Sequence, residues 1–261
     1  MTRHAIIAGA GGLPAAVVAA MAPVPLVCAL EGFVPEGVAV DHVFRVERLV
    51  PFLRMLADQG VATVTFAGAV QRPRLDPALF DPATARMVPR LLAAMQGGDD
   101  ATLREVVGIF EEAGFAVAGV EEIAPDLVPG AGVLCGTPTE ADAADATRAA
   151  AIVAALGAVD VGQGAVVAQG LCLAVETLPG TDAMLDWVAR TARRPNPAGA
   201  KGVVYKAPKP GQDRRIDLPT LGPQTVARAA AAGLAGIAWQ AGGVILLDRA
   251  GMVAAAKAAG L

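Results

Sequence analysis

The feature that most constrains the fold of this chain is its N-terminal run of residues 5–30, which is uncharged but interrupted by three glycines and three prolines. A lipid-exposed helix would leave backbone groups unpaired at so many interruptions. The run therefore predicts a short strand, a glycine turn, a helix through about residue 21 and a second strand at 24–30. We accordingly expect a soluble protein with neither a targeting segment nor a membrane span.

Strand and helix signals continue to alternate after this run. Apolar residues at helical spacing predict a helix over residues 47–59 that ends at Gly60. A β-branched run at 61–67 predicts the next strand, and two helices are expected near 84–95 and 99–113. Such alternation is typical of a mostly parallel sheet with right-handed crossovers, so we predict an N-terminal Rossmann-like α/β domain.

A second α/β domain is predicted for the rest of the chain. Residues 117–138 are rich in glycine and proline, and we place the boundary there, with domains at 1–130 and 131–261. The second domain is expected to begin with an alanine-rich helix over about 140–156. Its further expected elements are strands near 165–167, 171–176, 202–206, 236–239 and 244–247, and helices near 181–191, 223–232 and from 248 onwards.

The most highly charged loop of the second domain covers residues 205–222, with the sequence YKAPKPGQDRRIDLPTLG. Its prolines exclude a regular helix or an interior strand. Lysine and arginine are the usual partners of phosphate oxygens, and an aspartate among them can hold Mg²⁺ against the same phosphates. We therefore expect Lys206 and Lys209 to bind phosphate, and Asp217 to act in catalysis and metal binding. The alternatives are a solvated surface loop and, for Asp217, a buried salt bridge to a nearby cation.

The glycine turn GAGGLP, residues 9–14, follows a strand and opens a helix. Glycines in this position let the backbone approach a phosphate at the helix N-terminus. Glu31 follows the second strand, where a dinucleotide-binding fold places its ribose-binding acid. These features favour an NAD(P)-dependent oxidoreductase, although Pro14 replaces the third glycine of the fingerprint. A non-catalytic nucleotide-sugar-binding module fits the same turn, and so does a tight turn that binds nothing.

Three shorter motifs supply further candidates for ligand contacts. Arg72 follows the strand at 61–67, at the end where ligands of open α/β sheets collect. Gln163 lies between two glycines before a strand and can hydrogen-bond a base or a ribose. Thr181 or Asp182 is placed to cap a helix, and either side chain can also meet a phosphate. The corresponding purely structural roles are a surface arginine, a plain turn and a helix cap.

Composition argues against several classes of function. The net charge of −4 offers no electrostatic basis for general nucleic-acid binding. The chain has two histidines, which argues against histidine-based catalysis and histidine-rich metal sites. Cys28, Cys135 and Cys172 are widely spaced and form no CxxC pair. Their spacing argues against a disulfide framework and a zinc site, and fits a reducing cytoplasm.

Taken in order, the motifs of this chain resemble those of the LpxI family, the Mg²⁺-dependent UDP-2,3-diacylglucosamine pyrophosphatases of lipid A biosynthesis. The resemblance extends over nearly the whole chain. The segments that carry it are AGAGGLP (8–14), FAGAVQRP (66–73), GDDATLREVVGIFEEAGF (98–115), DVGQGAVVAQGLCLAVETLPGTDAML (160–185), YKAPKPGQDRRIDLPTLGPQTV (205–226) and AGLAGIAWQAG (232–242). One departure is Ala69, where the family pattern leads us to expect asparagine.

The resemblance implies two domains joined by a hinge, with the substrate bound between them. It implies hydrolysis of UDP-2,3-diacylglucosamine to UMP and 2,3-diacylglucosamine 1-phosphate (lipid X), with Mg²⁺ as cofactor and Asp217 as the essential residue. The positions that match substrate contacts of the family are Gly11, Gly12, Leu13, Gln163, Thr181, Asp182 and Lys206.

The lipid nature of that substrate adds further expectations. Its two acyl chains require an apolar groove, which the alanine, valine and leucine helices of the second domain can supply. We expect a cytoplasmic protein whose contact with the inner membrane is apolar and transient, because the chain has no basic helix. Formation of a homodimer stays open at this level.

Overall fold

The computed structural model describes residues 3–71 and 74–261, and the chain divides into two compact units. We call them the N-terminal unit, Met1–Asp126 with Asp213–Asp217, and the C-terminal unit, Leu127–Gln212 with Leu218–Leu261. The sequence analysis assigned all of residues 131–261 to the second domain, whereas the structure groups Asp213–Asp217 with the first. The chain therefore leaves the C-terminal unit after Gln212 and returns to it at Leu218.

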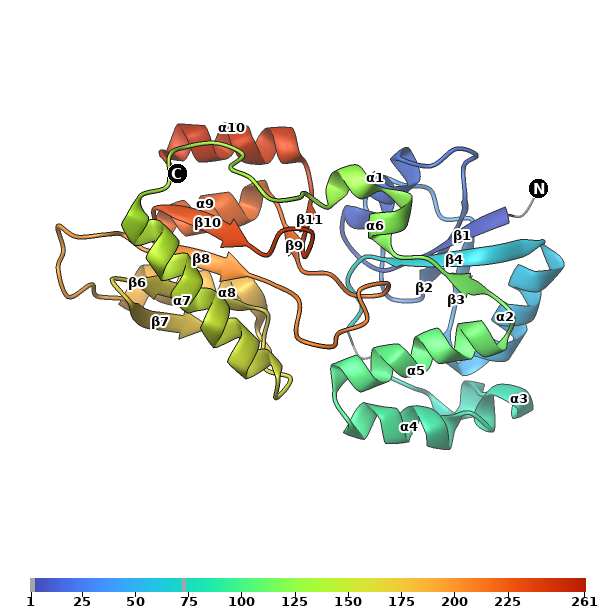
Figure 1. Cartoon of the computed structure of the whole chain (residues 1–261). Coiled ribbons are helices and arrows are strands. Elements are labelled where there is room, and N and C mark those ends of the chain that lie inside the picture. The colour runs from blue at the N-terminus through green and yellow to red at the C-terminus, as the bar shows by residue number, and fades with distance from the viewer. Residues whose placement is uncertain (1–2, 72–73) are drawn as a thin grey trace. The chain divides into compact units, whose positions relative to one another are not determined.

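The N-terminal unit is built on a five-stranded sheet in which every pairing is parallel (Figure 1). The strand order is that of the Rossmann fold, so the predicted fold class of this part is confirmed. Across the sheet the strands are β3 (His42–Phe44), β2 (Leu26–Leu30), β1 (Arg3–Ala8), β4 (Val61–Ala67) and β5 (Ala116–Val117). The α-helices in the described part of this unit are α1 (Leu13–Ala19), α2 (Leu49–Asp58), α3 (Pro82–Ala85), α4 (Val88–Gln96), α5 (Asp99–Glu112) and α6 (Val120–Ile123).

The spacing of apolar residues explains why α2 forms where the sequence predicts it. Leu49, Phe52 and Leu56 lie on its buried face. Phe52 meets Phe110 of α5 edge to face, with ring centroids 6.5 Å apart, in the apolar cluster that fills the core of the unit. This shared core holds α2 and α5 on the sheet and thereby fixes the loops at the ends of β1 and β4.

Two glycine turns approach each other at the carboxyl ends of β1 and β4. The backbones of Ala10 and Ala69 pair through two hydrogen bonds, with N···O distances of 2.9 and 3.0 Å. A Cβ atom at Gly9 would lie 2.6 Å from the carbonyl oxygen of Ala69, and one at Gly68 would lie 2.8 Å from the backbone of Gly9. Glycine is required at both positions, because the two loops meet backbone to backbone.

Ion pairs anchor the segment Asp213–Asp217 to the N-terminal unit. Arg214 pairs with Glu121 of α6 and Arg215 pairs with Glu111 of α5, each over 2.7 Å. These contacts explain why five residues of the charged loop belong to a unit that is otherwise built from the first half of the chain. Arg214 and Arg215, the two arginines of the loop, thus hold carboxylates of the protein itself.

Two further interactions stiffen the same segment. Ile216 packs against the apolar cluster of the N-terminal unit. The Arg215 guanidinium donates to both carboxylate oxygens of Asp213, over 3.0 and 2.7 Å. These hydrogen bonds lower the pKa of Asp213 below its ordinary value of 3.8 and raise the pKa of Arg215. The segment is therefore held by charge-assisted hydrogen bonds as well as by apolar packing.

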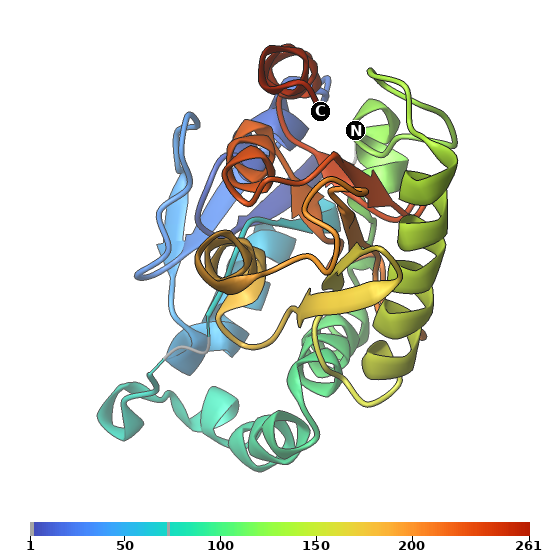
Figure 2. The ribbon, with the colours of Figure 1, turned by 90° about the vertical axis from the view of Figure 1, so that its left-hand side faces the viewer.

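The C-terminal unit is built on a four-stranded mixed sheet with helices on both faces. The strands lie in the order β10 (Gly236–Trp239), β8 (Val203–Lys206), β6 (Gly164–Ala168) and β7 (Leu171–Val175). β10 is parallel to β8, whereas β6 is antiparallel to both of its neighbours. Figure 2 shows α7 (Glu140–Gly157) on one side of this sheet and α8 (Gly180–Thr191) and α9 (Pro223–Ala231) on the other, which agrees with the apolar clusters.

A small second sheet completes the C-terminal unit. It pairs β9 (Thr220–Leu221) with β11 (Ile245–Leu246) in parallel, and α10 (Arg249–Ala259) follows. The predicted α/β class of the second domain is therefore confirmed. β3, β5 and β9 escape the sequence analysis, because two or three residues carry no readable alternation. The helix expected near 84–95 is interrupted, and α3 and α4 take its place.

Two further predictions concern the chain as a whole. All three cysteines are free, as their spacing predicts. No helix within residues 3–71 and 74–261 is both long enough and apolar enough to cross a bilayer.

The close approach of the two glycine turns predicts that alanine substitutions at neighbouring glycines differ strongly in their effect on stability. We expect Gly9→Ala to destabilise the protein by about 1–3 kcal/mol, because its methyl group collides with the backbone of Ala69. Gly12→Ala is the matched control, since a Cβ atom there meets nothing within 4 Å. Urea unfolding of both variants measures the difference, and equal stabilities would contradict the packing argument.

The Asp213–Arg215 pair predicts a pH-dependent contribution to stability. The pKa of Asp213 is lowered in the folded protein, so the pair stabilises above the unfolded value of 3.8 and this contribution is lost as pH falls further. We expect Asp213→Asn to lower the Tm by about 2–4 °C at pH 7, with the difference narrowing below about pH 4. Thermal melts across pH measure this. Asp58 is exposed, so Asp58→Asn is the control. A Tm difference between Asp213→Asn and the parent that stays constant across pH would refute the stabilising role of the Asp213–Arg215 pair.

Candidate active site

Strand direction brings three separate motifs to one end of the C-terminal sheet. β6 is antiparallel to β7 and β8, so its first residue lies beside the last residues of both neighbours. Gly164 at the start of β6 pairs with Lys206 at the end of β8, and its carbonyl oxygen accepts a hydrogen bond from the N–H of Glu176. Gln163, Glu176 and Lys206 therefore gather at this end. We call the group formed by Glu176, Thr181 and Lys206 the lysine site.

The ammonium group of Lys206 is buried in the lysine site, since this residue is only 7% exposed. Its Nζ atom donates a hydrogen bond to Oγ1 of Thr181 over 2.5 Å. A carboxylate oxygen of Glu176 lies 3.8 Å from the same nitrogen. The structure thus brings together two residues that the sequence predicts, Lys206 and Thr181. It adds Glu176, which the sequence analysis did not select.

The first turn of α8 carries both Thr181 and Asp182 into this region. The helix-cap role considered for these two residues is wrong, because Pro179 occupies the N-cap position and no side chain caps the helix. Asp182 forms an ion pair with Arg228 of α9 over 3.2 Å. That arginine also holds Asp186 over 2.5 Å, so the acidic face of α8 is fixed against α9.

Gln163 and Lys209 belong to a neighbouring network. The side-chain oxygen of Gln212 accepts hydrogen bonds from the Gln163 amide, over 2.9 Å, and from the backbone N–H of Lys209, over 2.8 Å. The ammonium group of Lys209 pairs with Asp160 over 2.5 Å. For Lys209 to bind a phosphate, that phosphate would have to compete with Asp160.

Asp217 ends the segment that is anchored to the N-terminal unit. It is partly buried, and its backbone N–H donates to the carbonyl oxygen of Asp213 over 3.3 Å. The next residue, Leu218, is buried and already belongs to the C-terminal unit. The position of Asp217 is therefore set by the anchors of its own segment on one side and by the return of the chain on the other.

The glycine turn of the N-terminal unit presents backbone groups at the carboxyl end of β1. Gly11 has a positive φ of +88°, and a Cβ atom there would meet nothing within 4 Å, so its requirement for glycine is conformational. Gly12 precedes α1, which begins at Leu13. Parallel α/β sheets bind ligands at this end of their strands. Arg72, predicted for the same region, lies outside the described residues.

Glu31, which an NAD(P)-dependent oxidoreductase would use for a ribose, forms an ion pair with Arg45. Both side chains are well exposed, at 46% and 43%. The carboxylate is therefore engaged with a neighbouring cation in this structure, and its pairing supplies a structural reason for an acid at this position.

The residues present suit a metal that binds together with its substrate. In the described part of the chain, no group of three or more histidine, cysteine, aspartate or glutamate side chains is arranged to hold a metal ion. Mg²⁺ is commonly bound by one or two carboxylates together with substrate phosphates and water. Asp217 offers one such carboxylate, so a site shared with substrate phosphates fits the described residues better than a complete cage of protein side chains.

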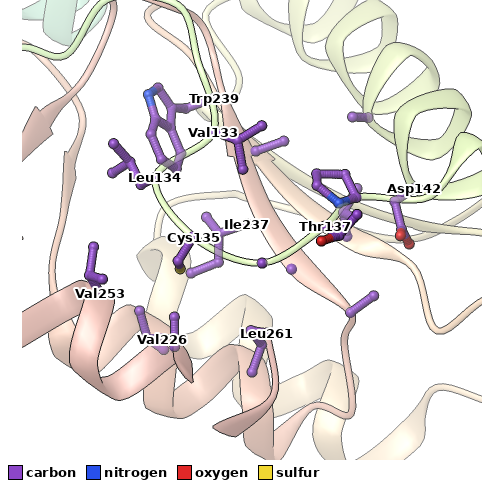
Figure 3. Close-up of a pocket in the computed structure, with 18 of the residues that line it drawn as sticks. Val133, Leu134, Cys135, Thr137, Asp142, Val226, Ile237, Trp239, Val253 and Leu261 are labelled. Atoms are coloured by element: carbon purple, nitrogen blue, oxygen red, sulfur yellow. The ribbon is translucent and has the colours of Figure 1, made fainter. Parts of the chain in front are cut away.

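The C-terminal unit also contains an apolar pocket with a volume of about 860 Å³. Its walls are the loop over residues 130–138, the edge strand β10, and parts of α7, α9 and α10. Figure 3 shows the side chains of Leu134, Cys135, Val226, Ile237, Trp239 and Val253 around it. Trp239 stands beside Lys206 in the register of β10 with β8, so one end of the pocket lies next to the lysine site. The sequence pattern does not outline this pocket, because its walls come from segments that are far apart in the chain, Lys201 and Val203 at the start of β8 included.

Comparison with known proteins assigns both halves of the chain to one family. Residues 3–127 match the LpxI N-terminal domain, and residues 130–261 match the LpxI C-terminal domain. The UDP-2,3-diacylglucosamine pyrophosphatase LpxI of Caulobacter vibrioides is 42% identical over 211 residues, which cover 80% of this chain and 75% of that protein. The chain therefore belongs to the LpxI family.

Proposed function

We propose that this protein hydrolyses the pyrophosphate bond of UDP-2,3-diacylglucosamine to UMP and 2,3-diacylglucosamine 1-phosphate, and that the reaction requires Mg²⁺. The similarity to the Caulobacter protein of that name supports the substrate and the reaction. The structural observation that carries the proposal is the buried ammonium group of Lys206 against the hydroxyl of Thr181. A desolvated cation whose position is set by a polar neighbour is suited to bind a phosphate oxygen.

The lysine site would bind the pyrophosphate. An ammonium group has three donors, and Thr181 accepts one of those of Lys206. The remaining donors can meet phosphate oxygens and neutralise the charge that grows on them during phosphoryl transfer. Gln163, Asp182 and Lys209 surround this position as candidate contacts. Gly11, Gly12 and Leu13 of the glycine turn stay predicted substrate contacts.

We assign the catalytic carboxylate to Asp217. This residue would hold Mg²⁺ together with phosphate oxygens of the substrate. Bound there, the ion supplies charge neutralisation and lowers the pKa of a coordinated water. The carboxylate of Asp217 can also accept a hydrogen bond from the attacking water and so orient it. The anchored segment Asp213–Asp217 keeps the carboxylate in place.

The apolar pocket would receive an acyl chain of the substrate. Its volume of about 860 Å³ falls in the range of about 300–1,000 Å³ that is common for ligand pockets. Most of its lining is apolar, and its Trp239 end lies one strand away from Lys206. The acyl groups of the substrate are attached to the same sugar as the pyrophosphate, so a pocket next to the phosphate-binding lysine is well placed for them. A lipid-linked substrate also implies transient contact with the membrane that holds it.

One observation favours a second candidate function. The strand order of the N-terminal unit is that of dinucleotide-binding domains, which supports an NAD(P)-dependent oxidoreductase or a nucleotide-sugar-binding module without turnover. The lysine site could bind the pyrophosphate of either ligand, but neither of these functions breaks the pyrophosphate bond or requires Mg²⁺. Measuring UMP release from UDP-2,3-diacylglucosamine, together with binding of NAD(P) and of UDP-sugars, separates the three candidate functions.

The first prediction of the proposal concerns Asp217. We expect the purified protein to release UMP from UDP-2,3-diacylglucosamine with Mg²⁺, to lose this activity with EDTA and to regain it when Mg²⁺ is restored. Asp217→Asn should lower kcat by at least about 100-fold, because charge stabilisation at the reacting phosphate is lost. Asp58→Asn, an exposed aspartate elsewhere in the N-terminal unit, should leave kcat unchanged.

Absence of UMP release from the folded, Mg²⁺-supplied protein would overturn the pyrophosphatase proposal. Binding of NAD(P) would then support the oxidoreductase, and binding of UDP-sugars without turnover would support the binding module.

The second prediction concerns the apolar pocket. Ala146 of α7 lines the pocket, and Ala146→Phe would fill part of it. We expect kcat/KM for the long-chain substrate to fall about tenfold, whereas a substrate with short acyl chains should be affected much less. Ala144→Phe is the matched control, because Ala144 lies on the exposed face of the same helix. Equal losses for long and short acyl chains would exclude this pocket as the acyl site.

A further inference from the structure

Glu176 is a largely buried acid, and neither helix capping nor core packing explains its placement. It follows β7, and its side chain is only 12% exposed. Its Oε1 atom faces Lys206 over 3.8 Å, whereas its Oε2 atom is buried and has no hydrogen-bond partner among the described residues. Burial of a carboxylate without full hydrogen bonding is costly, so a compensating role is expected.

The two glycines around Gln163 make room for this acid. A Cβ atom at Gly162 would lie 1.9 Å from the carbonyl oxygen of Glu176, and one at Gly164 would lie 2.7 Å from its Oε2 atom. The sequence analysis interpreted these glycines as brackets around a ligand-binding glutamine. The structure shows that they let the chain after β7 and its carboxylate lie directly against the start of β6.

The ammonium group of Lys206 faces this carboxylate at the end of the sheet. Glu176 is the acid that the structure pairs with its ammonium group. The other acid near Thr181, Asp182, forms its ion pair with Arg228. A buried ammonium group is stabilised by a nearby carboxylate, because desolvation otherwise disfavours the charged form.

We propose that Glu176 is a positioning residue for the pyrophosphatase reaction, which directs the ammonium group of Lys206 towards the scissile pyrophosphate. This inference rests on the proposed function, in which Lys206 binds a phosphate. At 3.8 Å the carboxylate is close enough to attract the ammonium group, but it is too far away to occupy a donor in a hydrogen bond. Thr181 sets the direction from one side, and the remaining donors stay available for phosphate oxygens. Glu176 does not touch the reacting atoms.

The test is a double-mutant cycle with Glu176→Gln and Lys206→Met, measured as kcat and KM for UDP-2,3-diacylglucosamine with Mg²⁺. Glu176→Gln keeps the shape of the side chain and removes its charge. We expect kcat to fall about tenfold or more, with KM within about twofold of the parent, because the aim of the ammonium group matters most in the transition state. In the Lys206→Met background the same change should have no further effect, because Glu176 acts through Lys206.

Glu105→Gln is the matched control. Glu105 is also a partly buried glutamate that pairs with a cation, Arg90, but it lies in the N-terminal unit. We expect its kcat and KM to stay within about twofold of the parent. Full activity of Glu176→Gln would overturn the inference, and so would losses that add to those of Lys206→Met.

A crystal structure of Glu176→Gln tests the same inference without turnover. We expect Nζ of Lys206 to move out of hydrogen-bond distance of Oγ1 of Thr181, and an unmoved ammonium group would overturn the positioning role. The two measurements also separate this inference from the proposed function. A parent protein that releases no UMP would refute the reaction, whereas the position of Lys206 in the variant would still decide the role of Glu176.

Discussion

A buried ammonium group organises the candidate site of this protein. Lys206 ends a central strand of the C-terminal sheet, and its position there is set by antiparallel pairing with β6. Once the charge is buried, its neighbours must compensate it, and Thr181 and Glu176 do so from two other segments. Glycine is needed at position 162 because the backbone of Glu176 lies against it, and Gly164 leaves room for the carboxylate of Glu176 where it now lies. Several residues that look unrelated in the sequence thus serve one electrostatic requirement.

The charged loop between β8 and β9 divides its charges between the two units. Lys206 and Lys209 pair within the C-terminal unit, whereas Arg214 and Arg215 pair with Glu121 and Glu111 of the N-terminal unit. The planar guanidinium group of arginine suits fixed pairs with carboxylates, and the compact ammonium group of lysine suits a phosphate as a point charge. The arginines anchor the segment that ends at Asp217, and the lysines stay close to the proposed phosphate.

The glycine turns of the N-terminal unit show a similar distinction between structural and ligand-binding roles. Gly9 and Gly68 are required because two backbones meet, whereas Gly11 is required by its positive φ and has open space around it. A sequence pattern treats these glycines alike. Only the packing shows that one pair is required where two backbones meet, whereas a Cβ atom at Gly11 or Gly12 would meet nothing within 4 Å.

The sequence by itself determined the strand–turn–helix alternation, the stiff charged loop, and the motifs that relate the chain to its family. These are local signals, because periodicity, glycine and proline act within a few residues. The tertiary structure alone decided which charges meet, since Lys206 and Thr181 are 25 residues apart, and Arg215 and Glu111 are 104 residues apart. It also decided the pocket and the role open to Glu176. Long-range contacts depend on how strands are ordered and directed in a sheet, and that order leaves no mark on the local pattern of residues.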